Sequence, residues 1–175
     1  MFWCRQYPEA RVTAFEPHPK HLNAIAGHLA ANHLSDRVKV VEAAAGVAEA
    51  ASYLVDAGSS STITESPGGY AVRVVDLFQT LDGPIDILKI DIEGGEYGLL
   101  ADERFGSLGA RIVVMEWHKT ANCPDGRKWC EDRLRRFGYR TRIGFEDPPL
   151  ARSSRHRKTQ VFDYVGVGWN SRLAY

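Results

Sequence analysis

Short apolar runs alternate with longer amphipathic stretches along the chain, a pattern that predicts strands and helices in alternation. Residues 11–15 and 38–41 are short apolar runs and predict strands, whereas the apolar side chains of residues 18–32 recur at helical spacing and predict a helix. Units of this kind build a largely parallel sheet covered by helices. Residues 1–7 predict the tail of a preceding helix.

The rest of the first half is shorter and less regular. Residues 51–55 and 72–77 predict strands, the second followed by a short helix, and small residues fill positions 43–46. Glycine and serine are frequent in residues 58–69. This composition is typical of a loop, so no regular element is expected there.

The second half has a clearer pattern. Residues 85–91 and 111–117 are apolar or β-branched at most positions. Such runs predict strands that are buried on both faces. A helix is expected at residues 93–100, between the two strands, and an amphipathic helix at residues 129–137, with Gly138 where that helix ends.

Two late strands are predicted at residues 139–145 and 160–169. No long helix separates them, so they are expected to form an antiparallel pair. We find neither an internal repeat nor a boundary to a second domain in the sequence. Residues 1–175 are therefore expected to form a single α/β domain.

Composition excludes several classes of protein. The 175 residues carry 22 basic and 22 acidic side chains, so no net charge favours nucleic acid. No apolar run is long enough to span a bilayer, and the first residues do not resemble a signal peptide. Cys4, Cys123 and Cys130 lack the spacing of a zinc site. We expect a cytoplasmic protein with reduced thiols and a small-molecule substrate, without a membrane or nucleic-acid partner.

Acidic residues close three of the predicted strands, namely Glu16, Asp91 and Glu116. In open α/β sheets, ligands bind outside the carboxyl ends of the strands. Desolvated carboxylates need polar partners. The sequence therefore predicts that these three side chains converge on one ligand-binding rim.

Glu16 has a specific interpretation, because an acidic residue at this position in nucleotide-binding units accepts hydrogen bonds from ribose hydroxyls. Alternatively, Glu16 caps the helix that begins near His18. The glycine-rich loop that cradles the cofactor normally lies about 20 residues earlier. No such run occurs upstream of Glu16, so we expect the first strand and the glycine loop to be missing.

Asp91, Glu93 and Glu96 lie at the junction of a predicted strand and helix, where they could form a cofactor- or substrate-facing cluster. Alternatively, Glu93 and Glu96, one helical turn apart, only favour the positive end of the helix dipole. A hard divalent cation beside Glu116 needs more convergent oxygens than the sequence shows, so no metal is expected. His18, His21 and His28 are expected on a solvated surface, and the basic residues at 152–158 in a solvated loop.

Several sequence blocks occur in the order found in one family. They include Phe15-Glu16-Pro17, Val75-Asp76-Leu77, Lys89-Ile90-Asp91-Ile92-Glu93-Gly94 and Met115-Glu116-Trp117-His118. Over residues 10–145 the chain resembles the FkbM-type methyltransferases. The block from Lys89 to Gly94 is the most specific part of the resemblance.

The resemblance implies a class I methyltransferase-like (Rossmann-like) doubly wound sheet, here with a late antiparallel strand pair and without the first strand and glycine loop. It implies S-adenosylmethionine as the methyl donor and O-methylation of a small molecule or sugar. Glu16 would then hold the ribose, Ala44 and Ala45 would border the adenine, and Asp91 would lie near the methionine moiety.

A hydroxyl acceptor benefits from a general base within hydrogen-bond reach. His118 is the candidate, with Glu116 orienting it or binding substrate hydroxyls, while Glu93 and Glu96 would face the substrate or support these groups. His118 could also be an ordinary surface histidine after a strand. Two other functions stay open: a truncated or decayed domain without catalysis, and a nucleotide-dependent oxidoreductase that uses a similar rim.

Overall fold

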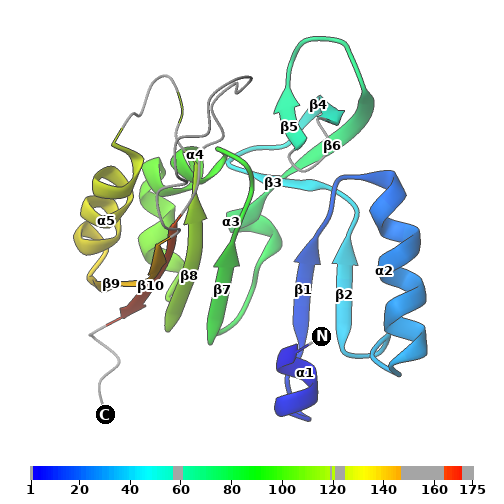
Figure 1. Ribbon diagram of the computed structural model, residues 1–175, viewed down its shortest axis with the longest axis horizontal. Coiled ribbons are helices and arrows are strands. Elements are labelled where there is room, and N and C mark those ends of the chain that lie inside the picture. The colour runs from blue at the N-terminus through cyan, green and yellow to red at the C-terminus, as the bar shows by residue number, and fades with distance from the viewer. Residues whose placement is uncertain (1, 57–60, 119, 121–124, 147–163, 171–175) are drawn as a thin grey trace, which may run out of the picture. The chain divides into compact units, whose positions relative to one another are not determined.

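The computed structural model describes residues 2–56, 61–118, 120, 125–146 and 164–170 (Figure 1). The chain divides into two compact units, residues 1–77 and 78–175. Each unit has its own sheets and helices and is described by itself. In the described residues, no helix is long and apolar enough to cross a membrane.

The first unit begins with helix α1 (Phe2–Gln6), strand β1 (Val12–Phe15), helix α2 (Pro19–Ala31) and strand β2 (Val38–Val41). β1 and β2 pair in parallel along their whole length, as the alternation of apolar runs predicts. Leu29 of α2 and Cys4 of α1 lie in one buried cluster, against which apolar side chains of both strands pack. The helical spacing therefore places the apolar face of α2 on this pair of strands.

A second sheet in this unit has the strand order β3-β6-β4-β5. Its strands are β3 (Ala44–Gly46), β4 (Ala50–Asp56), β5 (Ser61–Thr64) and β6 (Tyr70–Asp76). β3 pairs with β6 in parallel, and β4 pairs antiparallel with both β6 and β5.

β5 lies within residues 58–69, for which the sequence predicted only a loop, and that prediction was wrong. The sequence Ser61-Thr62-Ile63-Thr64 is rich in β-branched residues, which favour strands, but glycine and serine on either side conceal it. Gly69, the residue before β6, has a φ of 80°, and a Cβ there would collide with the carbonyl group of Leu54. Only glycine fits this close approach without rearrangement.

The second unit contains a four-stranded sheet in the order β7-β8-β10-β9. Helix α3 (Leu77–Thr80) begins at the last residue of the first unit and continues into the second. The other elements of the second unit are β7 (Ile87–Ile90), α4 (Glu96–Ala101), the 3₁₀ helix η1 (Glu103–Leu108), β8 (Ile112–Trp117), α5 (Gly126–Arg136), β9 (Tyr139–Glu146) and β10 (Tyr164–Asn170). β7 and β8 are parallel, and β10 is antiparallel to both β8 and β9. The predicted late antiparallel pair is confirmed.

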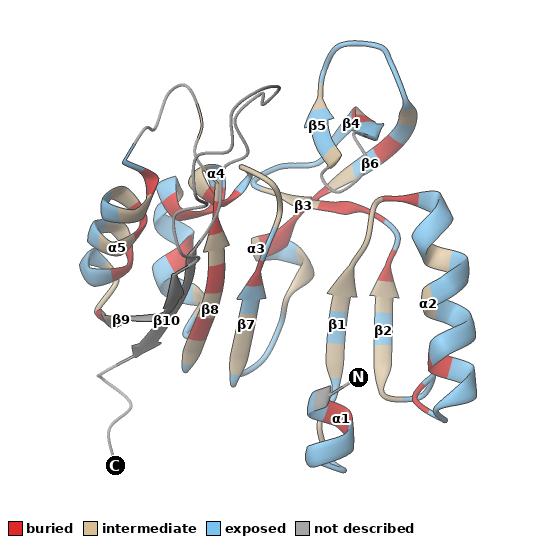
Figure 2. Cartoon of the chain, viewed as in Figure 1, coloured by how far each residue is buried: buried red, intermediate tan, exposed pale blue. Residues whose placement is uncertain are grey.

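β7 and β8 differ in burial, although the sequence predicted that both would be buried on both faces. β8 alternates between buried and half-buried positions, whereas in β7 only Ile90 is buried and Lys89 is exposed (Figure 2). Within the described residues β7 pairs with β8 alone. A strand at the edge of a sheet loses one covering neighbour, which explains the exposure.

Candidate functional site

The carboxyl ends of β7 and β8 lie side by side in the second unit. Ile90 is the register partner of Met115, so Asp91 and Glu116 follow at the same end of the sheet. Lys89 Nζ lies 2.7 Å from Asp91 Oδ2 and 3.7 Å from Glu116 Oε1. Two of the three predicted rim carboxylates therefore converge, and they share a lysine that the sequence analysis did not assign to the site.

The turn after Asp91 differs from the prediction. α4 begins at Glu96 rather than at Glu93, and Glu93 has a φ of 51°, followed by Gly94 at 101°. A residue with this backbone conformation is outside the right-handed helix. Glu93 and Glu96 are therefore not one turn apart on a common helix, and the predicted helix-dipole role does not apply to Glu93.

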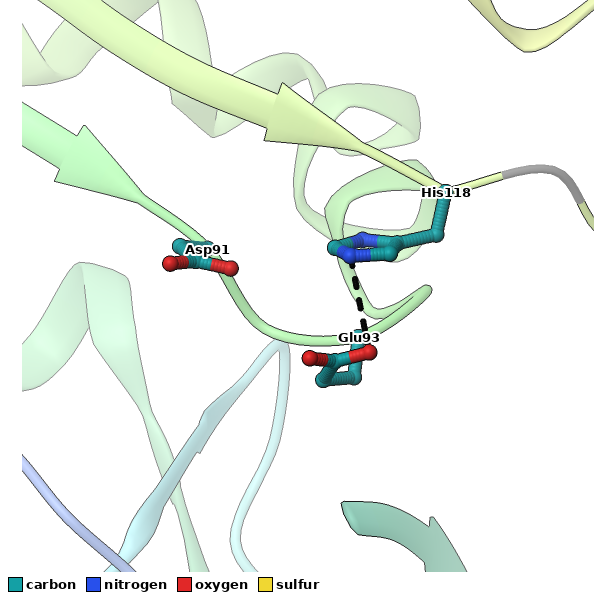
Figure 3. Close-up of side chains that lie close together, drawn as sticks. All are labelled: Asp91, Glu93 and His118. Carbon is teal, nitrogen blue, oxygen red and sulfur yellow. Dashed lines mark ion pairs between the residues drawn. The ribbon is translucent and has the colours of Figure 1, made fainter. Parts of the chain in front are cut away.

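This turn brings the two glutamates to opposite nitrogens of one imidazole. His118 follows the last residue of β8, and its Nδ1 lies 2.9 Å from Glu96 Oε1. Its Nε2 lies 3.4 Å from Glu93 Oε2, with Asp91 nearby (Figure 3). The side chain of His118 is 19% exposed, so this predicted base is largely shielded but still reachable.

Glu96 is the most deeply buried member of the cluster, at 0% exposure. Its Oε1 also accepts a hydrogen bond from Ile92 N at 3.2 Å, and its Oε2 has no hydrogen-bond partner within the described part of the chain. One carboxylate oxygen thus ties the turn after β7 to the ring of His118. A buried carboxylate without such partners would cost several kcal/mol, on the order of a lost buried ion pair.

A second contact holds the backbone of His118. The Tyr97 hydroxyl donates a hydrogen bond of 2.6 Å to the carbonyl oxygen of His118. Gly126, the first residue of α5, lies so close to Tyr97 and Trp117 that a Cβ at that position would collide with both side chains. Tyr97 was not predicted as a site residue, because nothing in its local sequence shows a partner 21 residues away.

The surroundings of His118 and Glu93 raise the pKa values of both side chains. The hydrogen bond to Glu96 raises the pKa of His118 above its ordinary value of 6.5, and the charges of Glu96, Glu93 and Asp91 raise it further. Burial raises the pKa of Glu93, and His118 opposes that change. Both shifts favour the protonated forms of His118 and Glu93 over those of the free side chains.

The third predicted rim residue, Glu16, lies in the first unit directly after β1. Its Oε1 accepts from His18 N at 2.7 Å, and its Oε2 lies 3.5 Å from His21 Nδ1. Glu16 is not the helix cap that the sequence analysis weighed as an alternative. His18 is the N-cap of α2, since its Nδ1 accepts from Lys20 N.

His18 also corrects the prediction that the early histidines lie on a solvated surface. It is 3% exposed, its ring contacts Tyr70, and its Nε2 lies 3.3 Å from Asp56 Oδ2. Because Nδ1 accepts from Lys20 N, Nε2 carries the proton that is donated to Asp56. His21 and His28 are exposed, as predicted.

Comparisons with known proteins bear on the family and the fold. The profile of the methyltransferase FkbM domain matches residues 2–141. The chain belongs to the FkbM methyltransferase domain family. A crystal structure of the methyltransferase FkbM from Methylobacillus flagellatus KT matches with a TM-score of 0.57 and 17% sequence identity. The match covers 91% of this chain and 36% of that one, and no curated protein matches the chain.

The FkbM domain has residues in its first unit that suit the ribose and adenine of a methyl donor. Glu16 Oε2 lies next to His21, which is mostly exposed and can move aside for a ligand. Ala44 and Ala45 form the start of β3 and present no bulky side chain. Phe15 is the register partner of Val41, so Glu16 and the chain leading to Ala44 leave β1 and β2 at the same end. These observations fit a ribose and an adenine.

The FkbM domain also has three groups that could ligate a metal ion. One atom each from Asp91, Glu93 and His118 lies within 4.8 Å of the others. Lys89 already pairs with Asp91, and His118 with Glu93. Lys89 thus supplies a positive charge beside Asp91 without a metal ion. The basic residues at 152–158, and Cys123, lie outside the described residues.

Proposed function

We propose that this FkbM domain takes part in S-adenosylmethionine-dependent methyl transfer to a hydroxyl of a small molecule or sugar, with His118 as the general base. The observation that carries the proposal is the placement of His118 at the carboxyl ends of β7 and β8, with Nδ1 held by Glu96. Ligands of open α/β sheets bind at this end of the strands.

S-adenosylmethionine would supply an electrophilic methyl group on a sulfonium sulfur. Glu16 would hold the ribose, because two carboxylate oxygens can accept from two vicinal hydroxyls. Ala44 and Ala45 would leave room for the adenine, and Asp91 would take the ammonium group of the methionine end. The role of Asp91 competes with Lys89, which contacts the same oxygen at 2.7 Å.

The residues of the second unit would act on the acceptor. His118 Nε2 would accept the hydroxyl proton, and Glu116 and Glu93 would accept hydrogen bonds from neighbouring hydroxyls of the acceptor. Orientation of the acceptor supplies much of the rate in a displacement of this kind. No metal ion is part of the proposed mechanism.

A glycine-rich loop and a first strand are still needed to cradle the cofactor in a fold of this kind. The 175 residues contain no such run ahead of Glu16. Turnover by the proposed mechanism therefore requires such a loop. Without one, the alternative of a non-catalytic domain applies, and neither cofactor binding nor turnover should be detected.

The test uses a chain that includes such a loop. It measures methyl transfer from radiolabelled S-adenosylmethionine to a pool of hydroxylated acceptors, together with calorimetric affinity for S-adenosylhomocysteine. His118→Ala should lower turnover by about 10²- to 10⁴-fold, the usual contribution of a general base, with little change in affinity. His28→Ala, which removes an exposed histidine of α2, is the matched control and should change neither.

Equal turnover in wild type and His118→Ala would remove His118 as the base. Thermal shifts with S-adenosylhomocysteine and with NADH distinguish the proposed methyltransferase from the alternative of a nucleotide-dependent oxidoreductase. Stabilisation by NADH but not by S-adenosylhomocysteine would favour an oxidoreductase and contradict the proposed function.

A further inference from the structure

The hydrogen bonds of Glu96 determine which nitrogen of His118 carries a proton. Glu96 Oε1 accepts from Ile92 N at 3.2 Å, as a carboxylate oxygen does. The same oxygen lies 2.9 Å from His118 Nδ1. Two acceptors cannot share one hydrogen bond without a proton, so Nδ1 must donate.

The other nitrogen lies in different surroundings. Nε2 is 3.4 Å from Glu93 Oε2 and lies on the side of Asp91, as Figure 3 shows. This separation is longer than the Nδ1 contact and close to the limit of a hydrogen bond. Nε2 can therefore gain and lose its proton, or turn to another partner, while Nδ1 stays bound to Glu96.

We propose that Glu96 is a positioning residue that holds neutral His118 in the Nδ1–H tautomer and leaves the Nε2 lone pair free toward Asp91 and Glu93. This is the reverse of a histidine side chain free in water, where the proton prefers Nε2. The tautomer follows from the geometry alone, and its catalytic meaning rests on the proposed function.

In that function Nε2 is the atom that takes the acceptor's hydroxyl proton. The O–H bond breaks, its electron pair stays on the acceptor oxygen, and an Nε2–H bond forms. The resulting imidazolium is stabilised by Glu96 at Nδ1 and later returns the Nε2 proton to water. Four charged or titratable groups lie around this residue. Glu96 and Glu93 lie at the two ring nitrogens, Asp91 belongs to the same cluster, and the Tyr97 hydroxyl binds the carbonyl oxygen. Lys89 in turn pairs with Asp91 and Glu116.

The ring nitrogens can be observed without any turnover. In the uniformly ¹⁵N-labelled chain, long-range ¹H–¹⁵N spectra distinguish a protonated ring nitrogen from a bare one, and His118→Gln identifies the signals of His118. Above the midpoint of its titration, wild-type His118 should show a protonated Nδ1 and a bare Nε2. A protonated Nε2 and a bare Nδ1 in wild type would overturn the proposal.

Three variants sharpen the test. Glu96→Gln keeps an amide oxygen for Ile92 N, so it should retain the Nδ1–H tautomer while the titration midpoint moves to lower pH. Glu96→Leu removes the acceptor and should return the proton to Nε2. Glu93→Gln, which changes the group at the other nitrogen, is the matched control and should keep Nδ1–H.

An unchanged spectrum in Glu96→Leu, or an Nε2–H tautomer in Glu93→Gln, would contradict the role of Glu96. If Glu96→Leu does not fold, wild type and Glu96→Gln still decide the question. Failure of the proposed function has a different signature, since His118 would then keep its Nδ1–H tautomer while His118→Ala retained full turnover.

Discussion

Each unit of the chain pairs a histidine with a glutamate after a parallel strand, but the two pairs are built differently. In the first unit His21 and Glu16 are five positions apart, and the histidine is mostly exposed. In the second unit His118 and Glu96 are 22 positions apart, and the glutamate is fully buried. An exposed pair contributes little to stability, whereas a buried carboxylate depends on its partner. The second pair should therefore dominate both the stability and the chemistry of the site.

His118→Leu should give the largest loss of stability, because it leaves the buried Glu96 with only the Ile92 amide as partner. We expect a decrease of about 3 kcal/mol in the free energy of unfolding, the cost of removing one partner of a buried charge pair. Urea denaturation followed by tryptophan fluorescence measures it. A loss as small as that of His21→Leu would show that the two pairs do not differ.

Gly126→Ala tests the packing behind His118 and should have the next largest effect. The added Cβ collides with Tyr97 and Trp117, so we expect a loss of about 1–3 kcal/mol, as for an overpacked core. Gly98→Ala in α4 is the control, because nothing lies within 4 Å of a Cβ there. That control should stabilise the chain slightly, by roughly 0.5–1 kcal/mol. Equal effects of the two changes would contradict the close packing at Gly126.

Glu16→Ala tests the proposed binding role of the first unit. Loss of a charge-assisted hydrogen bond to ribose should weaken the affinity for S-adenosylhomocysteine by about tenfold or more, corresponding to roughly 1.5–3 kcal/mol. Isothermal titration calorimetry measures the change. Glu42→Ala removes an exposed carboxylate just after β2 and should leave the affinity unaltered. An unchanged affinity in Glu16→Ala would refute the ribose assignment.

His21→Leu should have a small effect, about 0.5 kcal/mol or less, because exposed ion pairs contribute little. The same urea denaturation measures it beside His118→Leu. A loss of more than about 2 kcal/mol, well above the range for exposed pairs, would show that the Glu16 pair is structural rather than available to a ligand.

Addition of Mn²⁺ should have no effect at His118, since Lys89 already pairs with Asp91, one of the two carboxylates that could bind the ion. The probe is paramagnetic broadening of the His118 ring signals at equimolar Mn²⁺. Selective broadening that is lost in Asp91→Asn would establish a metal site and contradict the metal-free mechanism.

Local pattern predicted most of the strands and helices, because strand and helix periods follow from neighbouring residues. The parallel pair β1–β2, helix α2 and the antiparallel pair β9–β10 are confirmed. β5 was missed because a short β-branched run was surrounded by loop-forming residues. The predicted start of α4 was wrong, because the pattern of apolar positions does not reveal the left-handed conformation of Glu93.

The candidate site shows the same division between local and distant information. Acidic residues at strand ends were predicted, and Asp91 and Glu116 do share Lys89. The contacts of His118 with Glu96 and Tyr97 span more than 20 positions and could not be deduced from spacing. Burial of His18 was also unpredictable, because its partner Asp56 is 38 positions away.

The raised pKa of His118 also gives its pair a pH dependence. The protonated ring contributes stability that is fully present below pH 6.5 and is lost as the pH rises through the higher pKa of the folded state. Wild type should therefore become less stable on passing above pH 6.5, and His118→Gln should lack this step. A wild-type stability that rises through the same range would contradict the direction of the shift.

The pH dependence of methyl transfer tests the catalytic role of His118 most directly. A general base acts in its neutral form, so kcat should rise with pH and level off above a midpoint higher than 6.5, because Glu96 raises the pKa of His118. In Glu96→Gln the midpoint should move to lower pH. A rate that is independent of pH through this range, or a midpoint that Glu96→Gln does not move, would contradict the assignment of His118 as the base.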